Sequence, residues 1–456
     1  MEFRLSSLCG DDDKDKVEAW KTAIDLINKG KLEAEKVKHS AICYYSLLSA
    51  KDMRALSWAW ENVEALLDKK ILDIDEVKGL KMYFFKLLKY ASWVFSEVWD
   101  LVDGLATKGV ITREDAEKFI SLLKSYDEDV SSYAWEYVTV LLDRKILKPE
   151  EVIGVKDAFF QLLMTDDEEI SLAAWNSVIG LVDKGIISPD QVRQYKGYFF
   201  QLLSGGWVSG YAWETVKDLI DRGIITKDED RPFYSLLTSD SESVRLHAWE
   251  NLDVLLNEGV LDLEEIKGLK EYLLGLMRSK SKFLRLDAWE VAVKVVSRGV
   301  LNLDDLIENK KYFLRLLKLG KTCPKAWGLL PPLIEYSVIT EGDKDFFIDL
   351  LKYDKGWTRL RAWENVNTLL ENSIIEFNDV LRAKRYFFDL LSSKDYEVRL
   401  AAWKFLAKNM NKGLITAEEV ADWKDELRDM IVEAPNHLIR KDALEVYEEL
   451  KANGII

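Results

Sequence analysis

Few side chains in this sequence of 456 residues could act as nucleophiles, as acid–base groups near neutral pH or as metal ligands. The candidates are three cysteines and three histidines: Cys9, Cys43, Cys323, His39, His247 and His437. Their scattered positions match neither a zinc-ligand spacing nor a histidine-centred catalytic pattern, and no glycine-rich phosphate loop is present. The cysteines are therefore expected to be isolated thiols in a reducing compartment, and neither metal, cofactor nor enzyme activity is predicted.

Lysines recur at one fixed offset after each of a series of regularly spaced tryptophans, as Lys81 follows Trp60. This lysine column consists of Lys81, Lys156, Lys196, Lys270, Lys310, Lys384 and Lys424. An aliphatic residue four positions earlier and an apolar residue three positions later place each lysine at the border of a buried helical stripe, where its ammonium group can reach water. Two interpretations remain open. The column forms either a cationic groove for an acidic peptide or other polyanion, or an internal ladder of ion pairs with Asp and Glu of adjacent repeats.

Three further tryptophans, Trp93, Trp207 and Trp357, each stand six residues before one of the regular tryptophans. Other copies of the pattern usually carry a polar residue there. Because interface hot spots are enriched in tryptophan, these three residues are candidate anchors for a partner. The alternative is a structural contact with a neighbouring turn.

The regular tryptophans define an internal repeat that spans the whole sequence. They are Trp20, Trp60, Trp99, Trp135, Trp175, Trp213, Trp249, Trp289, Trp327, Trp363 and Trp403, with Leu444 at the same position of a twelfth copy. Ten residues later most copies carry a glycine, such as Gly259, where a left-handed residue ends a helix. A period of about 36–41 residues indicates stacked helix pairs. A tryptophan at the same position in each pair is expected to be buried between adjacent first helices rather than to bind a partner.

The copy between residues 239 and 278 illustrates the expected pair of antiparallel helices. Val244, Ala248, Leu252 and Leu255 give a first helix its apolar face. Asp262, three residues before a glutamate, is expected to open the second helix with a capping box. Adjacent phenylalanines in the second helices, as in 84–85, 159–160, 199–200 and 387–388, cannot point the same way. One ring of each pair is expected in the core and the other nearer the surface or the next repeat.

Tryptophan spacings of about 40, 38 and 36 residues recur in this order, which gives a three-repeat super-period of about 114 residues and indicates duplication of a three-repeat block. One solenoid over residues 1–456 is predicted. Residues 1–16 would form a partial cap helix and turn, 17–441 the stacked repeats, and 442–456 a C-terminal capping helix. Pro331 and Pro332 fall inside a first helix, where a kink or break is expected that bends the stack rather than serving as a hinge.

The formal net charge is −16, from 64 Lys plus Arg and 80 Asp plus Glu. This balance weighs against nucleic-acid binding, which normally needs a basic surface. Because the sequence has neither a signal-peptide pattern nor an apolar run of about 18 residues, a soluble cytoplasmic protein without membrane insertion is expected. Scarce glutamine beside abundant Lys and Glu favours a thermophilic source.

The order of helix signals resembles the HEAT repeat family. The residues that carry the resemblance are Ser243-Val244-Arg245 with Ala248, and Glu397-Val398-Arg399 with Ala402. The resemblance implies an all-α, right-handed α-solenoid of about twelve two-helix repeats, with the second helices lining its inner face. It also implies a non-enzymatic scaffold or adaptor, which would bind a protein or peptide through its groove or through the tryptophan-bearing turns. The alternative function is binding of nucleic acid or another polyanion along the lysine column.

Overall fold

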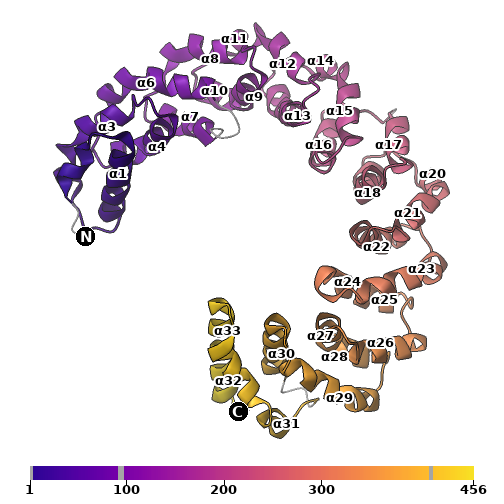
Figure 1. The fold of residues 1–456 in the computed structure, drawn as a ribbon. Coiled ribbons are helices and arrows are strands. Elements are labelled where there is room, and N and C mark those ends of the chain that lie inside the picture. The colour runs from indigo at the N-terminus through magenta and orange to yellow at the C-terminus, as the bar shows by residue number, and fades with distance from the viewer. Residues whose placement is uncertain (1–3, 91–96, 228, 410–413) are drawn as a thin grey trace. The chain divides into compact units, whose positions relative to one another are not determined.

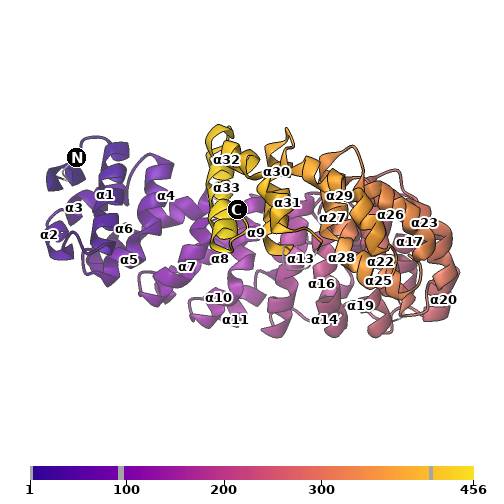
Figure 2. The same cartoon turned by 90° about the horizontal axis from the view of Figure 1, so that it is seen from below.

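The computed structural model describes residues 4–90, 97–227, 229–409 and 414–456, and every regular element in these ranges is a helix (Figure 1). The chain divides into two compact units, Met1–Pro232 and Phe233–Ile456. Each unit is a stack of helix pairs. In both views α1 (Asp13–Asn28), α4 (Met53–Glu61) and α7 (Glu97–Thr107) follow one another side by side (Figure 2). The predicted all-α repeat architecture is thereby confirmed.

In the first unit, one helix layer carries the regular tryptophans. This first layer consists of α1, α4 and α7 together with α5 (Val63–Asp68), α9 (Glu128–Glu136), α10 (Val138–Asp143), α13 (Glu168–Asp183) and α16 (Ser209–Asp221). The second layer consists of α2 (Ala34–Lys38), α3 (Ala41–Leu47), α6 (Ile74–Lys89), η2 (Arg113–Asp115), α8 (Ala116–Leu123), α11 (Pro149–Ile153), α12 (Lys156–Leu162), α14 (Pro189–Arg193) and α15 (Lys196–Leu203). A 3-10 helix, η1 (Leu5–Cys9), precedes α1, and the boundary between the units falls within α17 (Asp230–Leu237).

The second unit has the same two layers. Its first layer consists of α18 (Glu242–Glu250), α19 (Leu252–Asn257), α22 (Lys282–Val296), α24 (Lys325–Gly328), α25 (Leu330–Glu335), α27 (Gly356–Glu364), α28 (Val366–Glu371), α30 (Tyr396–Asn409) and α33 (His437–Ala452). Its second layer consists of α20 (Leu263–Gly268), α21 (Lys270–Met277), α23 (Leu303–Leu317), η4 (Glu341–Asp343), α26 (Lys344–Leu351), α29 (Phe377–Leu391), α31 (Ala417–Ala421) and α32 (Lys424–Glu433). The short η3 (Gly320–Thr322) lies between α23 and α24.

The first layer lies on the inner side of the curve in each unit, and the second layer lies on the outer side (Figure 1). The expectation that the second helices line the inner face was therefore wrong. The residue types explain the direction of the curve. A buried alanine precedes the tryptophan in most first helices, as at Ala134 and Ala248, and allows neighbouring first helices to pack closely. Several second helices instead carry bulky phenylalanine pairs, as at 84–85 and 159–160, and we infer that this bulk keeps the outer helices further apart.

The eleven regular tryptophans are all buried, with at most 3% of each side chain exposed, as predicted. In six of them the indole N–H donates to the backbone carbonyl twelve residues earlier, at the end of the preceding second helix: Trp20, Trp60, Trp135, Trp249, Trp363 and Trp403. In six copies the tryptophan ring also contacts an aromatic ring in the second helix of its own pair, at 4.9–5.3 Å between centroids. A tryptophan that makes both contacts joins two consecutive helix pairs.

The predicted left-handed residue ends the first helices. Gly259 has φ of +68°, and the copies without glycine use the same conformation at Lys70, Lys145, Ser337 and Ser373, with φ between +56° and +58°. The turn geometry therefore does not depend on glycine, although only glycine adopts it without strain.

A break in the first helix is confirmed at the prolines, since α24 ends at Gly328 and α25 begins at Leu330. The break is not specific to them. α4/α5, α9/α10, α18/α19 and α27/α28 break at the same register without proline. Pro331 and Pro332 occupy the first turn of α25, where a missing N–H costs no helical hydrogen bond.

Asp262 caps α20, because its carboxylate accepts from the N–H groups of Glu264 and Glu265. The expected reciprocal bond of a capping box is replaced by another partner, since the Asp262 N–H donates to the Tyr234 hydroxyl at 3.3 Å. The second helices of two short copies open with that reciprocal backbone contact, in which the N–H of Thr112 donates to the Asp115 carboxylate and that of Thr340 to Asp343, each at 3.0 Å. Their matching 3-10 turns, η2 and η4, fit the super-period.

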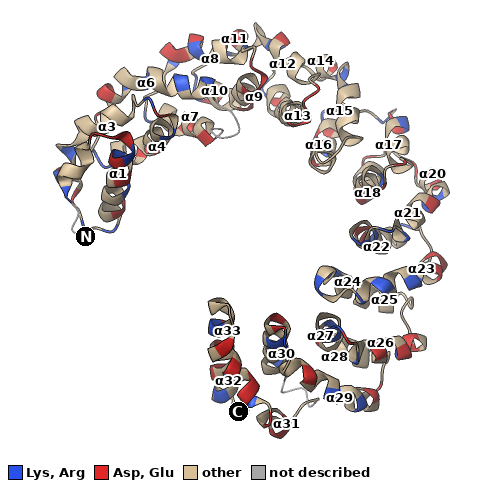
Figure 3. Ribbon diagram, in the orientation of Figure 1, with Lys and Arg blue, Asp and Glu red and all other residues tan. Residues whose placement is uncertain are grey.

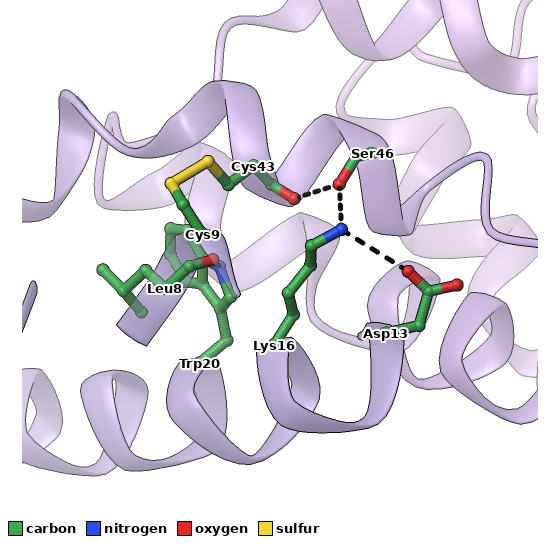
Figure 4. Close-up of a disulfide and its surroundings, with 7 residues drawn as sticks. All are labelled: Leu8, Cys9, Asp13, Lys16, Trp20, Cys43 and Ser46. Carbon is green, nitrogen blue, oxygen red and sulfur yellow. Dashed lines mark hydrogen bonds and ion pairs between the residues drawn. A yellow bond between two sulfur atoms is a disulfide. The ribbon is translucent and has the colours of Figure 1, made fainter. Parts of the chain in front are cut away.

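Cys9 and Cys43 form a disulfide that ties η1 to α3, with 5.2 Å between their Cα atoms (Figure 4). The expectation of isolated thiols was therefore wrong for these two residues and right for Cys323, which is free and buried. Sequence distance did not reveal the pair, because stacking of the first helix pair on η1 brings the two cysteines together. The cysteines no longer support a reducing compartment, and a cytoplasmic location stays a prediction.

Candidate partner-binding site

Of the three candidate anchor tryptophans, Trp93 lies outside the described residues, and the other two have different surroundings. Trp207 is 63% exposed in the turn before α16. Its ring meets that of Tyr211 edge-on at 6.1 Å between centroids, and Tyr211 is itself 56% exposed. Two exposed aromatic side chains therefore stand together at one turn of the first unit.

Trp207 borders a cavity of about 570 Å³ on the first helix layer of that unit. α9 and α10 contribute Glu136 and Thr139 to its wall, and α13 contributes Glu169 and Asn176. The tight approach of these helices follows from Gly180, where an added Cβ would lie 2.8 Å from the Thr139 methyl group. The cavity thus combines an aromatic side chain, two carboxylates and an amide, with no lysine or arginine in its lining.

Glu136 is exposed on the first helix layer, and neighbouring protein atoms still desolvate its carboxyl. This desolvation, together with the nearby charge of Asp100, raises the pKa of Glu136 to about 7. The turn before α9 is also strongly acidic. Partial burial and the charges of Asp127 and Asp167 raise the pKa of Asp129 above its ordinary value. A cation bound near Glu136 and Asp129 would offset the desolvation of these two carboxylates and their repulsion by neighbouring acidic residues.

Glu136 and Tyr211 were not among the predicted site residues. A signal was present, since an acidic residue directly follows the regular tryptophan in most copies, as at Glu61, Glu136 and Glu250. Glu250 resembles Glu136, because burial and the Asp287 carboxylate raise its pKa. The tryptophan side chain is buried, and the next residue on the helix points to the inner face of the layer.

Trp357 fits the alternative interpretation, a contact with a neighbouring turn. Its ring lies 5.4 Å from the Lys321 ammonium and 5.7 Å from the Arg361 guanidinium. Lys321 also pairs with Glu397, which binds this turn to the next repeat. The cavity beside Trp357 has a volume of about 380 Å³, and the ring is only partly exposed.

Most of the lysine column takes part in ion pairs with the next repeat. Lys81 binds Asp115, Lys270 binds Asp305 and Lys310 binds Asp343, each at 2.8 Å. Lys196 pairs in the same way with Glu229, and Lys384 with Glu419. Each of these carboxylates also accepts the first backbone N–H of its own second helix, as Asp305 does from Asn302.

These contacts are those of the internal ladder, and they leave few free ammonium groups for a polyanion. Lys156 and Lys424 have no carboxylate within ion-pair distance in the described part of the chain. The residue of the next repeat that faces Lys156 by register is the neutral Gln191, and Lys424 lies on the last second-layer helix. Figure 3 shows both signs of charge along both layers of each unit, rather than one basic face.

Two further features are absent from the described residues. No group of three or more His, Cys, Asp or Glu side chains is placed to hold a metal ion. No described helix combines the length and the apolar character needed to cross a membrane.

No family model matches the sequence. A protein of Acidianus ambivalens, described as an uncharacterized protein in the sor 5′ region, is 34% identical over 74 residues, which make up 16% of this chain and 32% of that protein. The similarity thus spans about a third of that curated relative.

Among solved structures, an assembly of Kap95p with RanGDP is similar over 97% of this chain and 65% of the matched chain, with a TM-score of 0.55 and 11% identity. The fold is a HEAT-like α-solenoid. Weaker likenesses are to the AP-3 complex in an intermediate open conformation (TM-score 0.44, 13% identity, 96% of this chain and 95% of that one) and to importin beta (TM-score 0.42, 13% identity, 98% and 57%).

Proposed function

We propose that this protein is a non-enzymatic scaffold that binds a partner protein at the Trp207 cavity on the inner helix layer of its first unit. The observation that carries the proposal is the exposed Trp207 ring beside an acidic, partly desolvated cavity. An indole face attracts a cationic side chain, and a carboxylate held in a desolvated site gains from one. The proposed ligand is therefore an exposed segment of the partner that carries lysine or arginine.

In this arrangement the aliphatic stem of the ligand residue packs on Trp207, and its charged head reaches Glu136 or Glu169. Binding through such a cavity uses the solenoid as a rigid frame, because α9 and α13 are fixed by their buried alanines and tryptophans and α10 by its buried Val138 and Leu141. The solved Kap95p structure describes binding to RanGDP, and a protein partner for this chain is proposed by analogy with that fold alone. The ion pairs of the lysine column do not favour the polyanion alternative.

The test is a binding titration of the full chain with a fluorescently labelled arginine-containing peptide, at several salt concentrations. Trp207→Ala is expected to weaken binding by about tenfold or more, equivalent to roughly 1.4 kcal/mol or more. Trp357→Ala, at the same register of the second unit, is the matched control and is expected to leave the affinity unchanged. Equal affinities of the two variants would refute the proposal, as would equal binding of an aspartate-containing peptide.

A further inference from the structure

A second cavity opens on the outer helix layer of the first unit, between α6 and α8. This α6/α8 groove has a volume of about 640 Å³. Met82 and Tyr90, at its edge, are 64% and 61% exposed, and Phe85 forms part of its lining. Large apolar side chains that are exposed next to a cavity mark a surface that favours a partner.

Two other junctions of the chain show what fills the corresponding space. At each of these two junctions the second phenylalanine of a Phe-Phe pair, which is the counterpart of Phe85, stacks on an aromatic ring from the next repeat. Phe160 lies 5.1 Å from Tyr195 with the rings 22° apart, and Phe388 lies 5.8 Å from Trp423 with the rings 5° apart. Tyr195 and Trp423 each stand directly before a lysine of the column.

The repeat that follows α6 is one of the short copies. η2 leads directly into α8, and the residue twenty positions after the regular tryptophan, where the other two copies carry Tyr195 and Trp423, is Phe119. Phe85 instead meets Phe119 edge-on at 5.1 Å and lies 4.6 Å from the Lys118 ammonium. Phe85 is only 5% exposed, as Phe160 is, so the apolar surface that the α6/α8 groove offers to a ligand is mainly that of the exposed Met82 and Tyr90 side chains.

The charge of this groove is opposite to that of the whole chain. Lys86, Lys89 and Lys118 line it, against one acidic residue, Glu117. Lys118 is paired with Asp115 at 3.3 Å, whereas Lys86 and Lys89 have no carboxylate within ion-pair distance among the described residues. In a protein with a net charge of −16, this local excess of lysine favours an acidic ligand.

We infer that the α6/α8 groove binds a segment of a partner protein in which an aromatic side chain is flanked by aspartate or glutamate. The ring would pack against the exposed Met82 and Tyr90 side chains, beside the edge of Phe85. The flanking carboxylates would pair with Lys86 and Lys89. This surface is separate from the Trp207 cavity in its layer, residues and charge.

The probe is a fluorescein-labelled peptide with one phenylalanine flanked by aspartates, titrated against the full chain. Saturable binding is expected, and replacing the phenylalanine of the peptide by alanine should weaken it by about tenfold or more. Met82→Asp, or Lys86→Glu combined with Lys89→Glu, should weaken it to a similar extent. Val432→Asp, at an apolar residue of α32 that is 76% exposed, is the control for an added surface charge and should leave binding unchanged.

Two further arms keep this inference independent of the proposed function. Trp207→Ala should leave affinity for the acidic peptide intact, and the double lysine variant should bind a peptide with phenylalanine flanked by arginines better than the wild type does. The inference is overturned if the wild type binds uncharged and acidic peptides equally, or if the groove variants bind as the wild type does. A self-association of the chain that Met82→Asp abolishes would overturn it too, because a second copy would then be the occupant.

Discussion

The indole N–H of Trp363 donates to the backbone carbonyl of Leu351, twelve residues earlier, at 3.1 Å. Leu351 ends α26 of one helix pair, and Trp363 lies in α27 of the next. Trp289, in the same unit, is equally buried, and its ring lies 5.3 Å from Phe313, as that of Trp363 does from Phe387. The Trp289 N–H, however, has no acceptor among the described residues. The two tryptophans therefore differ mainly in this hydrogen bond.

Trp363→Phe is expected to destabilise its junction by about 1–3 kcal/mol more than Trp289→Phe does, because it leaves a buried carbonyl without a donor. Both changes remove similar ring area, which cancels in the comparison. Hydrogen exchange of α27 and α22, measured by mass spectrometry, reports each junction separately. Equal loss of protection in the two variants would show that packing alone, and not the hydrogen bond, holds the junction.

Ser373→Gly is expected to stabilise the second unit by about 0.5–1 kcal/mol, because serine at φ of +57° is in a left-handed conformation that favours glycine. The matched reverse change is Gly299→Ala, at φ of +73°. An added Cβ at Gly299 meets no atom within 4 Å, so its expected cost of about 1–2 kcal/mol comes from the backbone alone. Urea unfolding of both variants checks the two signs, and a destabilised Ser373→Gly would contradict the argument.

The local features of the fold could be predicted from the sequence because each depends on residues near one another in the chain. The tryptophan position and the left-handed turn are of this kind, whereas the break before Pro331 recurs in copies without proline and was expected only at the prolines. The inner layer could not be predicted in this way. It depends on how closely Ala134 or Ala248 lets the next first helix approach, compared with the spacing that the phenylalanine pairs impose on the other layer.

The candidate site was predicted only in part, because some of its features depend on the packing of the neighbouring repeat. The exposure of Trp207 could be predicted because a tryptophan stands where most copies carry a polar residue. Trp357 replaces a polar residue in the same way, but its ring makes a cation–π contact with Lys321. The choice between the two outcomes lies in the neighbouring repeat. The ion pairs of the lysine column likewise needed the register between adjacent second helices, which places Asp305 opposite Lys270.

Lys344→Met is expected to lower the stability of the second unit at neutral pH and to have little effect in acid. In the wild type the Lys344 ammonium donates to the Asp379 carboxylate at 2.9 Å and holds the pKa of Asp379 below the ordinary 3.8. The stabilisation from Asp379 is therefore present above pH 3.8 and is lost as the pH falls through the lowered pKa. The same contact raises the pKa of Lys344, so its contribution persists below 10.5 and is lost only at higher pH.

Urea midpoints of the wild type and Lys344→Met should therefore differ at pH 7 and converge only as the pH falls through the lowered pKa of Asp379. Lys424→Met is the matched control, because this lysine of the column has no carboxylate within ion-pair distance in the described part of the chain, and it should not change either midpoint. A gap between wild type and Lys344→Met that persists unchanged in acid would show that the methylene stem, not the charge pair, provides the stability.

Binding of a cationic peptide at the Trp207 cavity should strengthen with pH. With the pKa of Glu136 at about 7, the carboxyl is mostly protonated at pH 6 and mostly ionised at pH 8, and only the ionised form attracts the ligand. Affinity should therefore rise by roughly tenfold over this interval. Glu136→Gln should bind weakly and nearly independently of pH, and an unchanged pH dependence in that variant would assign the titration to another group.

Reduction of the Cys9–Cys43 disulfide should loosen the start of the first unit without affecting the rest of the solenoid. The bond closes a loop with a sequence separation of 34, and a crosslink of that span contributes roughly 3–4 kcal/mol by restricting the unfolded chain. The disulfide also fixes the neighbouring residue Leu8, whose carbonyl accepts a hydrogen bond from the Trp20 indole N–H at 3.1 Å (Figure 4). Because helix pairs contact mainly their neighbours, the loss should stay local.

Hydrogen exchange with and without a reductant measures this effect in η1, α1 and α3. Faster exchange is expected in these elements on reduction and in the Cys9→Ser variant, whereas α13 and α22 should exchange as before. Cys323→Ser is the control for a lone buried thiol and should not respond to reductant in this way. If the whole chain lost protection together, stability would be shared along the solenoid rather than summed repeat by repeat, and the local account of the first helix pair would fail.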